Sequence, residues 1–264
     1  MTERPTKQFF KEAINYLTPF VKQAGEMILE SWNKIEIAKQ KDVRDVATKT
    51  DVAVENFLKE KILFKWPSHG FWGEEGEKRI NPSSSYQWLV DPIDGTKFYV
   101  GLAPFFQTFI ALTFNGAPVL GLMYHPLSRQ FFSAYQGGGT YLNGKIILVK
   151  SSFFLNEAVV DVDFGGLLDK KEEEKKWMLD KLSRIIERSY RVRMSAGALS
   201  TYIVTGAIDA YIDLAGSKPQ EIAARIIIAQ EAGLKTEKIK TAFGEKLVVS
   251  REPALSEIKQ ILLK

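Results

Sequence analysis

The sequence predicts a layered protein with an α+β N-terminal half and an α/β C-terminal half. Two amphipathic helical patterns open the chain, and short runs typical of β-strands follow them. Beyond about residue 145 the pattern changes to alternating strands and helices. No low-complexity linker separates the two patterns, so we expect residues 1–144 and 145–264 to form two closely packed halves.

Both opening helices follow from the spacing of apolar residues. Those from Phe9 to Trp32 recur at helical intervals, which indicates one long amphipathic helix. A second helix is expected over residues 51–64, with Thr50 as its N-cap residue. Its buried face would carry Val54, Phe57, Leu58 and Ile62.

After Pro67 the period of the apolar pattern becomes that of β-strands. The expected strands cover residues 88–91, 108–114, 119–124 and 130–135. Asn115 and Gly116, between two of these runs, are typical of a tight hairpin turn. The N-terminal half should therefore contain a mostly antiparallel sheet beside its two helices.

In the C-terminal half, strands and helices alternate. The expected strands cover residues 158–162 and 210–213, and the expected helices cover residues 172–188, 196–205 and 219–232. Gly233 should end the last of these helices, because a glycine just after the final turn favours the left-handed C-cap conformation.

The composition narrows the possible chemistry. The chain has no cysteine, which excludes disulfides, zinc ribbons, iron–sulfur clusters and thiol catalysis. His69 and His125 lie far apart in the sequence, so we interpret both as structural residues rather than as metal ligands. A hydrophobic content of 45% and a charged content of 26% are those of a globular protein that folds alone.

The charge pattern argues against nucleic-acid and membrane partners. The 36 basic residues are mixed with 32 acidic ones, and the run 170–176 alternates in sign, as in a solvated helix start. Glycine and proline interrupt the uncharged stretch 98–128, which predicts two buried strands rather than a membrane-spanning helix. Residues 1–5 lack the apolar core of a signal peptide, so we expect a cytoplasmic protein.

The most informative segment follows the apolar run 86–90 and reads Asp91-Pro92-Ile93-Asp94-Gly95-Thr96. Its two carboxylates, three residues apart, leave a strand end and could hold a hard cation. Its glycine permits a close backbone approach, and a helix starting at its threonine would turn free N–H groups toward a phosphate. Taken alone, the pattern also fits a surface turn.

Other carboxylates could complete a metal site. Mg²⁺ takes oxygen ligands in near-octahedral geometry, so a Mg²⁺-dependent phosphatase needs carboxylates from several elements. Besides the two in the central segment, the candidates are Asp51 and Glu221 at helix starts and the adjacent pair Glu74 and Glu75. Together these residues predict a magnesium-dependent phosphatase.

These motifs resemble those of the inositol monophosphatase family of lithium-sensitive, Mg²⁺-dependent phosphatases. The similar segments occur in the same order through most of the chain, at residues 45–51, 73–75, 88–96, 139–144, 191–206, 223–224 and 231–233. The resemblance implies the αβαβα sandwich fold of the sugar phosphatases. The archaeal-type inositol monophosphatase/fructose-1,6-bisphosphatase is one candidate subtype.

The resemblance also implies two or three Mg²⁺ ions per site and roles for specific residues. The activating ion would be held by Glu74, Asp91 and the Ile93 carbonyl. A second ion would be held by Asp91, Asp94 and Glu221. Glu75 would lie near a third ion. Asp51, Glu74 and Thr96 are the expected catalytic residues; Asp51 and Thr96 would orient and deprotonate the attacking water.

The residues expected to contact substrate are Asp94, Gly95, Thr96, Ser195 and Asp213. Asp213 fits a plain strand-end acid equally well, because its spacing to Glu221 is about one residue longer than in inositol-using members. Two positions depart from the family pattern: Glu221 replaces the usual aspartate, and Met194 replaces the usual glycine before Ser195.

The expected reaction is hydrolysis of a small polyol or sugar phosphate by metal-activated water, in line and without a phosphoenzyme. Inositol 1-phosphate and fructose 1,6-bisphosphate are the first candidates, and 3′-phosphoadenosine 5′-phosphate and histidinol phosphate are the alternatives. A catalytically weak member that binds a ligand in a metal-dependent way is a further alternative. The family resemblance also implies a homodimer.

Residues 139–146 match a phosphate-binding P-loop except at Ile146, where a serine or threonine would be required to bind magnesium. Asn143 and Gly144 lie between extended runs, so we expect a hairpin here instead.

Overall fold

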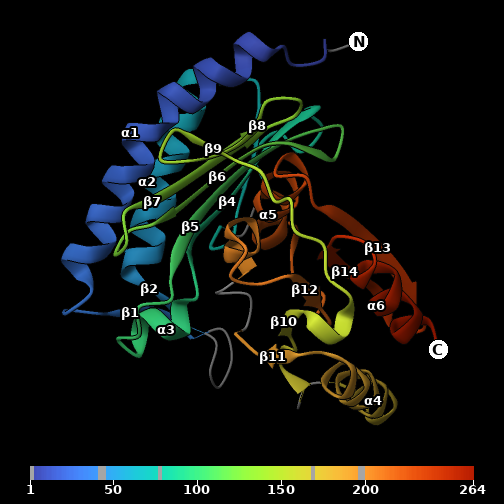
Figure 1. The fold of residues 1–264 in the computed structure, drawn as a ribbon. Helices are drawn as coiled ribbons and strands as arrows, with labels where there is room; N and C mark the ends of the chain where they lie inside the picture. Colours follow the sequence, from blue (N-terminus) through green and yellow to red (C-terminus); the bar gives the residue numbers. More distant parts are fainter. Residues whose placement is uncertain (1–2, 41–45, 77–78, 168–169, 196–199) are drawn as a thin grey trace. The chain divides into compact units, whose positions relative to one another are not determined.

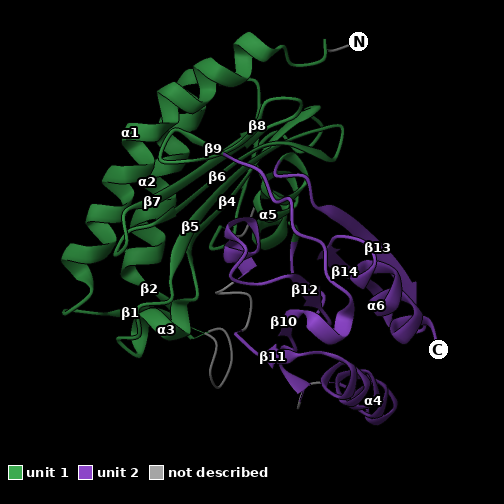
Figure 2. Ribbon diagram, in the orientation of Figure 1, with its two compact units in different colours: residues 1–146, 219–231 green, residues 147–218, 232–264 purple. Residues whose placement is uncertain are grey.

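The computed structural model describes residues 3–40, 46–76, 79–167, 170–195 and 200–264. The chain divides into two compact units, one of residues 1–146 and 219–231 and the other of residues 147–218 and 232–264 (Figure 2). The expected halves, 1–144 and 145–264, differ from these units by two residues at the first boundary and in the placement of one later segment. Residues 219–231 belong to the first unit, because they form a helix that packs on its sheet.

The first unit is built on a seven-stranded sheet (Figure 1). Its strands, in spatial order, are β3 (Gly70–Gly73), β4 (Tyr86–Asp94), β5 (Gln107–Phe114), β6 (Ala117–His125), β7 (Gln130–Tyr135), β8 (Gly139–Leu142) and β9 (Lys145–Ile147). β3 is parallel to β4, and each following pair through β8 is antiparallel. The sheet is therefore mostly antiparallel, as predicted.

Two Asn-Gly turns connect neighbouring strands of this sheet. Asn115 and Gly116 have φ values of 50° and 83° and join β5 to β6 in the predicted hairpin. Asn143 and Gly144, with φ values of 49° and 78°, join β8 to β9 in the same way. Residues 139–146 are therefore a hairpin and not a phosphate-binding loop.

The helices α1 (Lys7–Ser31) and α2 (Lys49–Lys65) pack on one face of the sheet (Figure 1). The buried side chains of α1 recur at helical spacing and meet alternate residues of the strands, among them Val90 and Ile110. Before α2, β1 (Ile37–Gln40) and β2 (Val46–Thr48) form a small antiparallel pair.

The N-cap of α2 is Thr48, so the prediction of Thr50 was wrong by two residues. The Thr48 hydroxyl accepts a hydrogen bond from the Asp51 amide, and the Asp51 carboxylate accepts one from the Thr48 amide at 2.8 Å. This reciprocal capping box needs an acid three residues after the cap, a position that Asp51 fills for Thr48. The Thr50 hydroxyl instead accepts a hydrogen bond from the Tyr99 hydroxyl.

The opposite face of the sheet is covered by α5 (Pro219–Glu231) (Figure 1). A Cβ atom at Gly121 would lie 2.6 Å from the Ile227 side chain and 2.9 Å from the Ala224 carbonyl, so the helix approaches β6 closely. At the end of α5, the Glu231 carboxylate accepts hydrogen bonds from three consecutive amides, at residues 137–139. These contacts hold the middle and the C-terminal end of α5 on the sheet.

The second unit contains a five-stranded sheet with the order β11 (Arg191–Arg193), β10 (Val159–Asp163), β12 (Ala210–Asp213), β14 (Gly244–Ser250) and β13 (Lys235–Thr241). Its core is formed with α4 (Glu172–Arg188) and α6 (Ala254–Leu263). The predicted bounds of α4 and β12 are confirmed. The sequence patterns did not identify β13, β14 and α6.

The helix expected over residues 196–205 lies partly outside the described residues, which resume at residue 200. Ser200–Thr205 forms the 3₁₀-helix η3, and another short 3₁₀-helix, η1 (Leu155–Glu157), precedes β10. Among the helices of the described residues, none combines the length and apolarity needed to cross a bilayer.

His69 is a packed structural residue. Its Nδ1 atom accepts a hydrogen bond from Trp88 Nε1 at 3.1 Å, and its ring stacks on Tyr86 with the centroids 4.5 Å apart. A ring nitrogen that accepts a hydrogen bond carries no proton. Burial of the imidazole lowers the pKa of His69 from 6.5 to about 4.

We predict that His69 makes the folding stability depend on pH. Between pH 6.5 and about 4 the unfolded chain binds a proton at His69 that the folded chain does not, so stability falls as the pH falls. The contribution is up to about 1.4 kcal/mol per pH unit. The His69→Gln variant, which retains a hydrogen-bond acceptor, should show a correspondingly shallower slope in urea unfolding. An unchanged slope would show that His69 protonates freely in the folded protein.

Candidate active site

The central motif forms the end of β4 and the turn that follows. The pairing of β4 with β5 is irregular between Asp91 and Asp94, which separates the two carboxylates from a regular strand. Gly95 then adopts a φ of +86° as the N-cap of α3 (Thr96–Val100). A Cβ atom there would lie 2.5 Å from the Phe105 carbonyl, so both the conformation and the space require glycine.

Asp91 lies at the centre of a group of carboxylates. Its side chain is buried, and its Oδ1 atom accepts no hydrogen bond from the described residues. Burial, together with the negative charges of Glu74, Asp94 and Glu221, raises the pKa of Asp91 well above its ordinary value. The fold therefore brings together four of the predicted metal ligands, which come from β4, from α5 and from the segment after β3.

Asp51 and Thr96 form the second part of the site. The Asp51 Oδ2 atom is held by the backbone and the hydroxyl of Thr48, while its Oδ1 atom lies 3.3 Å from the Thr96 hydroxyl. The Thr96 hydroxyl also donates a hydrogen bond to the Ile93 carbonyl at 2.8 Å. Burial is the main cause that raises the pKa of Asp51. The structure thus brings Asp51 and Thr96, which were predicted to act together, into contact and connects Thr96 to the Ile93 carbonyl.

Glu55, which is not among the predicted site residues, supports this group. Its side chain is buried on α2, one turn after Asp51, and its Oε2 atom accepts a hydrogen bond from the Glu75 amide at 2.7 Å. A Cβ atom at Gly73 would lie 2.2 Å from the Glu55 carboxylate, so Gly73 leaves room for it. Glu55 therefore fixes the backbone that carries Glu74. An acid four residues after Asp51, on the apolar face of a helix, was the available sequence signal.

Arg225 is the second residue that the sequence analysis missed. Its Nη2 atom donates a hydrogen bond to Asp94 Oδ2 at 2.8 Å, and Gln107 Nε2 donates to the same oxygen at 2.7 Å. Arg225 lies in a helix made mainly of isoleucine and alanine, four residues after Glu221. A single cation at that position was a signal that Arg225 is buried beside an acid.

The side chains of this group fit Mg²⁺ in chemistry. They offer several carboxylate oxygens and a backbone carbonyl, the ligands that Mg²⁺ prefers, and Asp91 Oδ1 has a free lone pair in a buried position. As they stand, no three aspartate, glutamate or histidine side chains of the described residues converge closely enough to form a complete metal cluster. The assignment of Glu74, Glu75, Asp91, Ile93, Asp94 and Glu221 as ligands stays a prediction.

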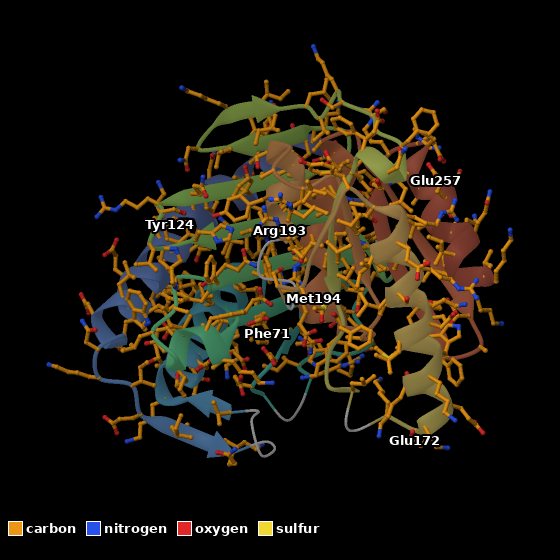
Figure 3. The ribbon with its side chains drawn as sticks, turned by 60° about the horizontal axis from the view of Figure 1, so that its bottom comes forward. Phe71, Tyr124, Glu172, Arg193, Met194 and Glu257 are labelled. Atoms are coloured by element: carbon orange, nitrogen blue, oxygen red, sulfur yellow. The ribbon has the colours of Figure 1, made fainter. Side chains whose placement is uncertain are left out.

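Ser195 and Asp213 belong to the second unit and have structural partners there. The amide and hydroxyl of Ser195 donate hydrogen bonds to the Asp161 carboxylate at 3.1 and 2.7 Å. The Asp213 carboxylate accepts hydrogen bonds from the amides of residues 216 and 217, both at 2.8 Å. This geometry supports the alternative in which Asp213 is a strand-end acid. Met194, labelled in Figure 3, is 64% exposed.

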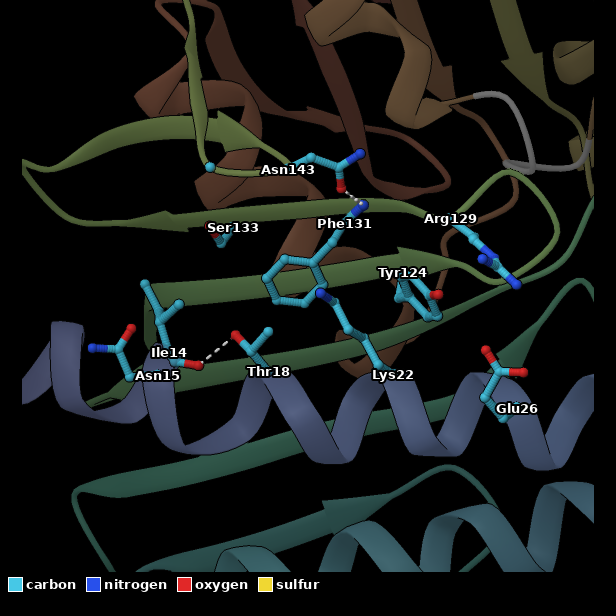
Figure 4. A pocket seen from close by; sticks show the side chains of 11 residues that line it. Ile14, Asn15, Thr18, Lys22, Glu26, Tyr124, Arg129, Phe131, Ser133 and Asn143 are labelled. Atoms are coloured by element: carbon cyan, nitrogen blue, oxygen red, sulfur yellow. Dashed lines mark hydrogen bonds between the residues drawn. The ribbon is translucent and has the colours of Figure 1, made fainter.

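A pocket of about 640 Å³ lies elsewhere in the first unit, between α1 and the strands β6 and β7 (Figure 4). Its lining includes Lys22, Glu26 and Arg129, and none of the predicted site residues lines it. The predicted metal and substrate residues therefore lie outside this pocket.

Comparison with known proteins identifies the family of the chain. The profile of the inositol monophosphatase family matches residues 11–260. Inositol monophosphatase 2 of Solanum lycopersicum is 31% identical over 229 residues, which cover 84% of this chain and 86% of that protein.

Solved structures share the fold. The extragenic suppressor protein suhB of Bartonella henselae superimposes with a TM-score of 0.85 at 22% identity, covering 96% of this chain and 99% of that one. An IMPase/NADP phosphatase complexed with Mg²⁺ and phosphate gives a TM-score of 0.82 at 20% identity, covering 96% and 95%. The predicted fold class is confirmed by these likenesses. The family profile spans nearly the whole chain, and the chain therefore belongs to the inositol monophosphatase family.

Proposed function

We propose that this member of the family is a Mg²⁺-dependent phosphomonoesterase that acts on a small polyol phosphate, with inositol 1-phosphate as the first candidate. The observation that carries the proposal is the grouping of Glu74, Asp94 and Glu221 around the buried Asp91 carboxylate. Such a concentration of negative charge is costly without a cation, and a phosphate ester also needs a cation beside it.

Glu74, Asp91 and the Ile93 carbonyl would hold the activating ion. Bound Mg²⁺ supplies a Lewis acid that makes water more acidic and withdraws charge from the phosphoryl group. The hydrogen bond from the Thr96 hydroxyl orients the Ile93 carbonyl, and that from the Glu75 amide to Glu55 fixes the backbone beside Glu74. The residues around the ligands thus limit their movement.

Thr96 and Asp51 would position and deprotonate the attacking water. The Thr96 hydroxyl can direct its proton to Asp51 or to the Ile93 carbonyl, which leaves its lone pair free to accept a hydrogen bond from water. The raised pKa of Asp51 makes its carboxylate a better proton acceptor near neutral pH. Direct attack by this water on phosphorus needs no phosphoenzyme.

Several substrates are compatible with this chemistry. Fructose 1,6-bisphosphate is the second candidate, followed by 3′-phosphoadenosine 5′-phosphate and histidinol phosphate. One structural relative is described as an IMPase/NADP phosphatase, which adds a nucleotide phosphate to the set. Specificity depends on the residues around the bound substrate. The predicted substrate contacts Ser195 and Asp213 belong to the second unit, and their role stays a prediction. A homodimer, implied by the resemblance, is part of the same proposal.

Phosphate release from these five esters, measured with Mg²⁺ and with EDTA, tests the proposed activity. We expect the highest kcat/KM for inositol 1-phosphate and no release without a divalent ion, because the carboxylates alone repel a phosphate. Release from none of the esters, with retained binding of one of them, would instead identify a metal-dependent binding protein.

Asp91→Asn should lower kcat/KM by about a thousandfold, because several kcal/mol of charge stabilisation depend on the metal ligands. The variant should still fold without Mg²⁺ and be at least as stable as the parent, since it removes a buried charge that three acids repel. Thermal unfolding should no longer respond to Mg²⁺.

Asp180→Asn, on the exposed surface of α4, is the matched control and should keep both the activity and the Mg²⁺ response. Activity of Asp91→Asn within a few-fold of the parent would contradict the assignment of Asp91 as a ligand.

A further inference from the structure

Arg225 is an unusual residue for its position in the fold. It lies in the middle of α5, where the neighbouring residues from Ile222 to Ala229 are otherwise apolar and buried. Its side chain is only 5% exposed. Burial of a guanidinium group is costly unless an acid and further hydrogen bonds compensate for the lost hydration. The partner of the Arg225 guanidinium therefore indicates the role of this residue.

That partner is Asp94, whose side chain is 11% exposed. The guanidinium donates to Asp94 Oδ2 at 2.8 Å, and Gln107, the register partner of Asp94 on β5, donates to the same oxygen at 2.7 Å. Two donors on one oxygen fix the orientation of the carboxylate. Because an arginine stays protonated at any physiological pH, the charge beside Asp94 is permanent.

The position of the guanidinium is fixed from a second side. It lies over the ring of Phe109, 4.6 Å from the centroid. Phe109 is the register partner of Asp91, and register partners point to the same face of a sheet. The guanidinium therefore lies on the face of the sheet that carries Asp91, on the same helix as Glu221 and one turn after it.

We propose that Arg225 is a built-in cation that takes the place of a second divalent ion at Asp94, so that this site binds one divalent ion tightly. The inference rests on the proposed function, because it concerns the same carboxylates. Asp91, Asp94 and Glu221 are the residues that the family resemblance assigns to a second ion. In this chain, one of the three is already engaged by a fixed positive charge.

The charges of the group agree with this arrangement. Glu74, Asp91, Asp94 and Glu221 carry four negative charges when ionised. A single divalent ion alone would leave two of them uncancelled, and with Arg225 only one is left. A second divalent ion at Asp94 would have to displace the guanidinium or lie beside it, where like charges repel. Arg225 acts through Asp94 and is a positioning residue.

Titration of the metal-free full-length protein with Mn²⁺ in the presence of inorganic phosphate tests this inference. Electron paramagnetic resonance counts the free Mn²⁺, and isothermal titration calorimetry gives the affinities. We expect one tight ion in the wild-type protein. Arg225→Gln should bind a second ion about tenfold or more tightly than the wild type does, because the repulsion is removed.

Two variants serve as controls. Arg225→Lys keeps the charge and should bind Mn²⁺ like the wild type. Arg188→Gln removes a half-exposed arginine that lies 3.8 Å from Glu257 in the second unit. This variant should also bind the same number of Mn²⁺ ions as the wild type.

Two tight ions in the wild type, or an affinity for the second ion that Arg225→Gln does not change, would overturn the inference. The number of Mn²⁺ ions that the wild-type protein binds tightly tests the inference even if Arg225→Gln does not fold. The readout needs no substrate, so a failure of the proposed phosphatase activity would be recognised separately from a failure of this inference.

Discussion

Mutual repulsion among acidic side chains around the buried Asp91 carboxylate is the constraint on which the first unit depends. Burial and three neighbouring negative charges all disfavour its ionised form. A protein that needed only stability would place apolar residues there. In the proposed function a cation restores the balance, and the carboxylates would hold it beside the phosphate of the substrate.

The scaffold resists this repulsion by fixing several of the acids around Asp91 through groups outside the cluster. Asp51 is held by the capping box of α2, and the backbone beside Glu74 is held by Glu55. Glu221 depends on α5, which is attached to the sheet by its close packing at Gly121 and by the three amides that bind Glu231. Such preorganisation keeps the acids in place before any ion arrives.

Much of this structure was predicted from local sequence patterns, because helix bounds and turns depend on residues that are close together in the sequence. The bounds of α4 and the turn at Asn115 depend on residues close in sequence. The position of the α2 cap was missed because two threonines were available, although the acid three residues after Thr48 marks Thr48 as the cap. Arg225 was missed for another reason. Its partner Asp94 lies 131 residues away in the sequence, and no periodic pattern records such a pair.

The path of the chain between the two units also governs how the active site is made during synthesis. The chain leaves the first unit after residue 146, returns at residue 219 and leaves again after residue 231. The ribosome therefore completes the whole seven-stranded sheet well before α5 is synthesised. Until then, the face of the sheet on which α5 packs is not covered by that helix. Glu221 and Arg225 arrive together on α5. A nascent chain thus acquires its full set of acids and its internal counter-charge in the same step.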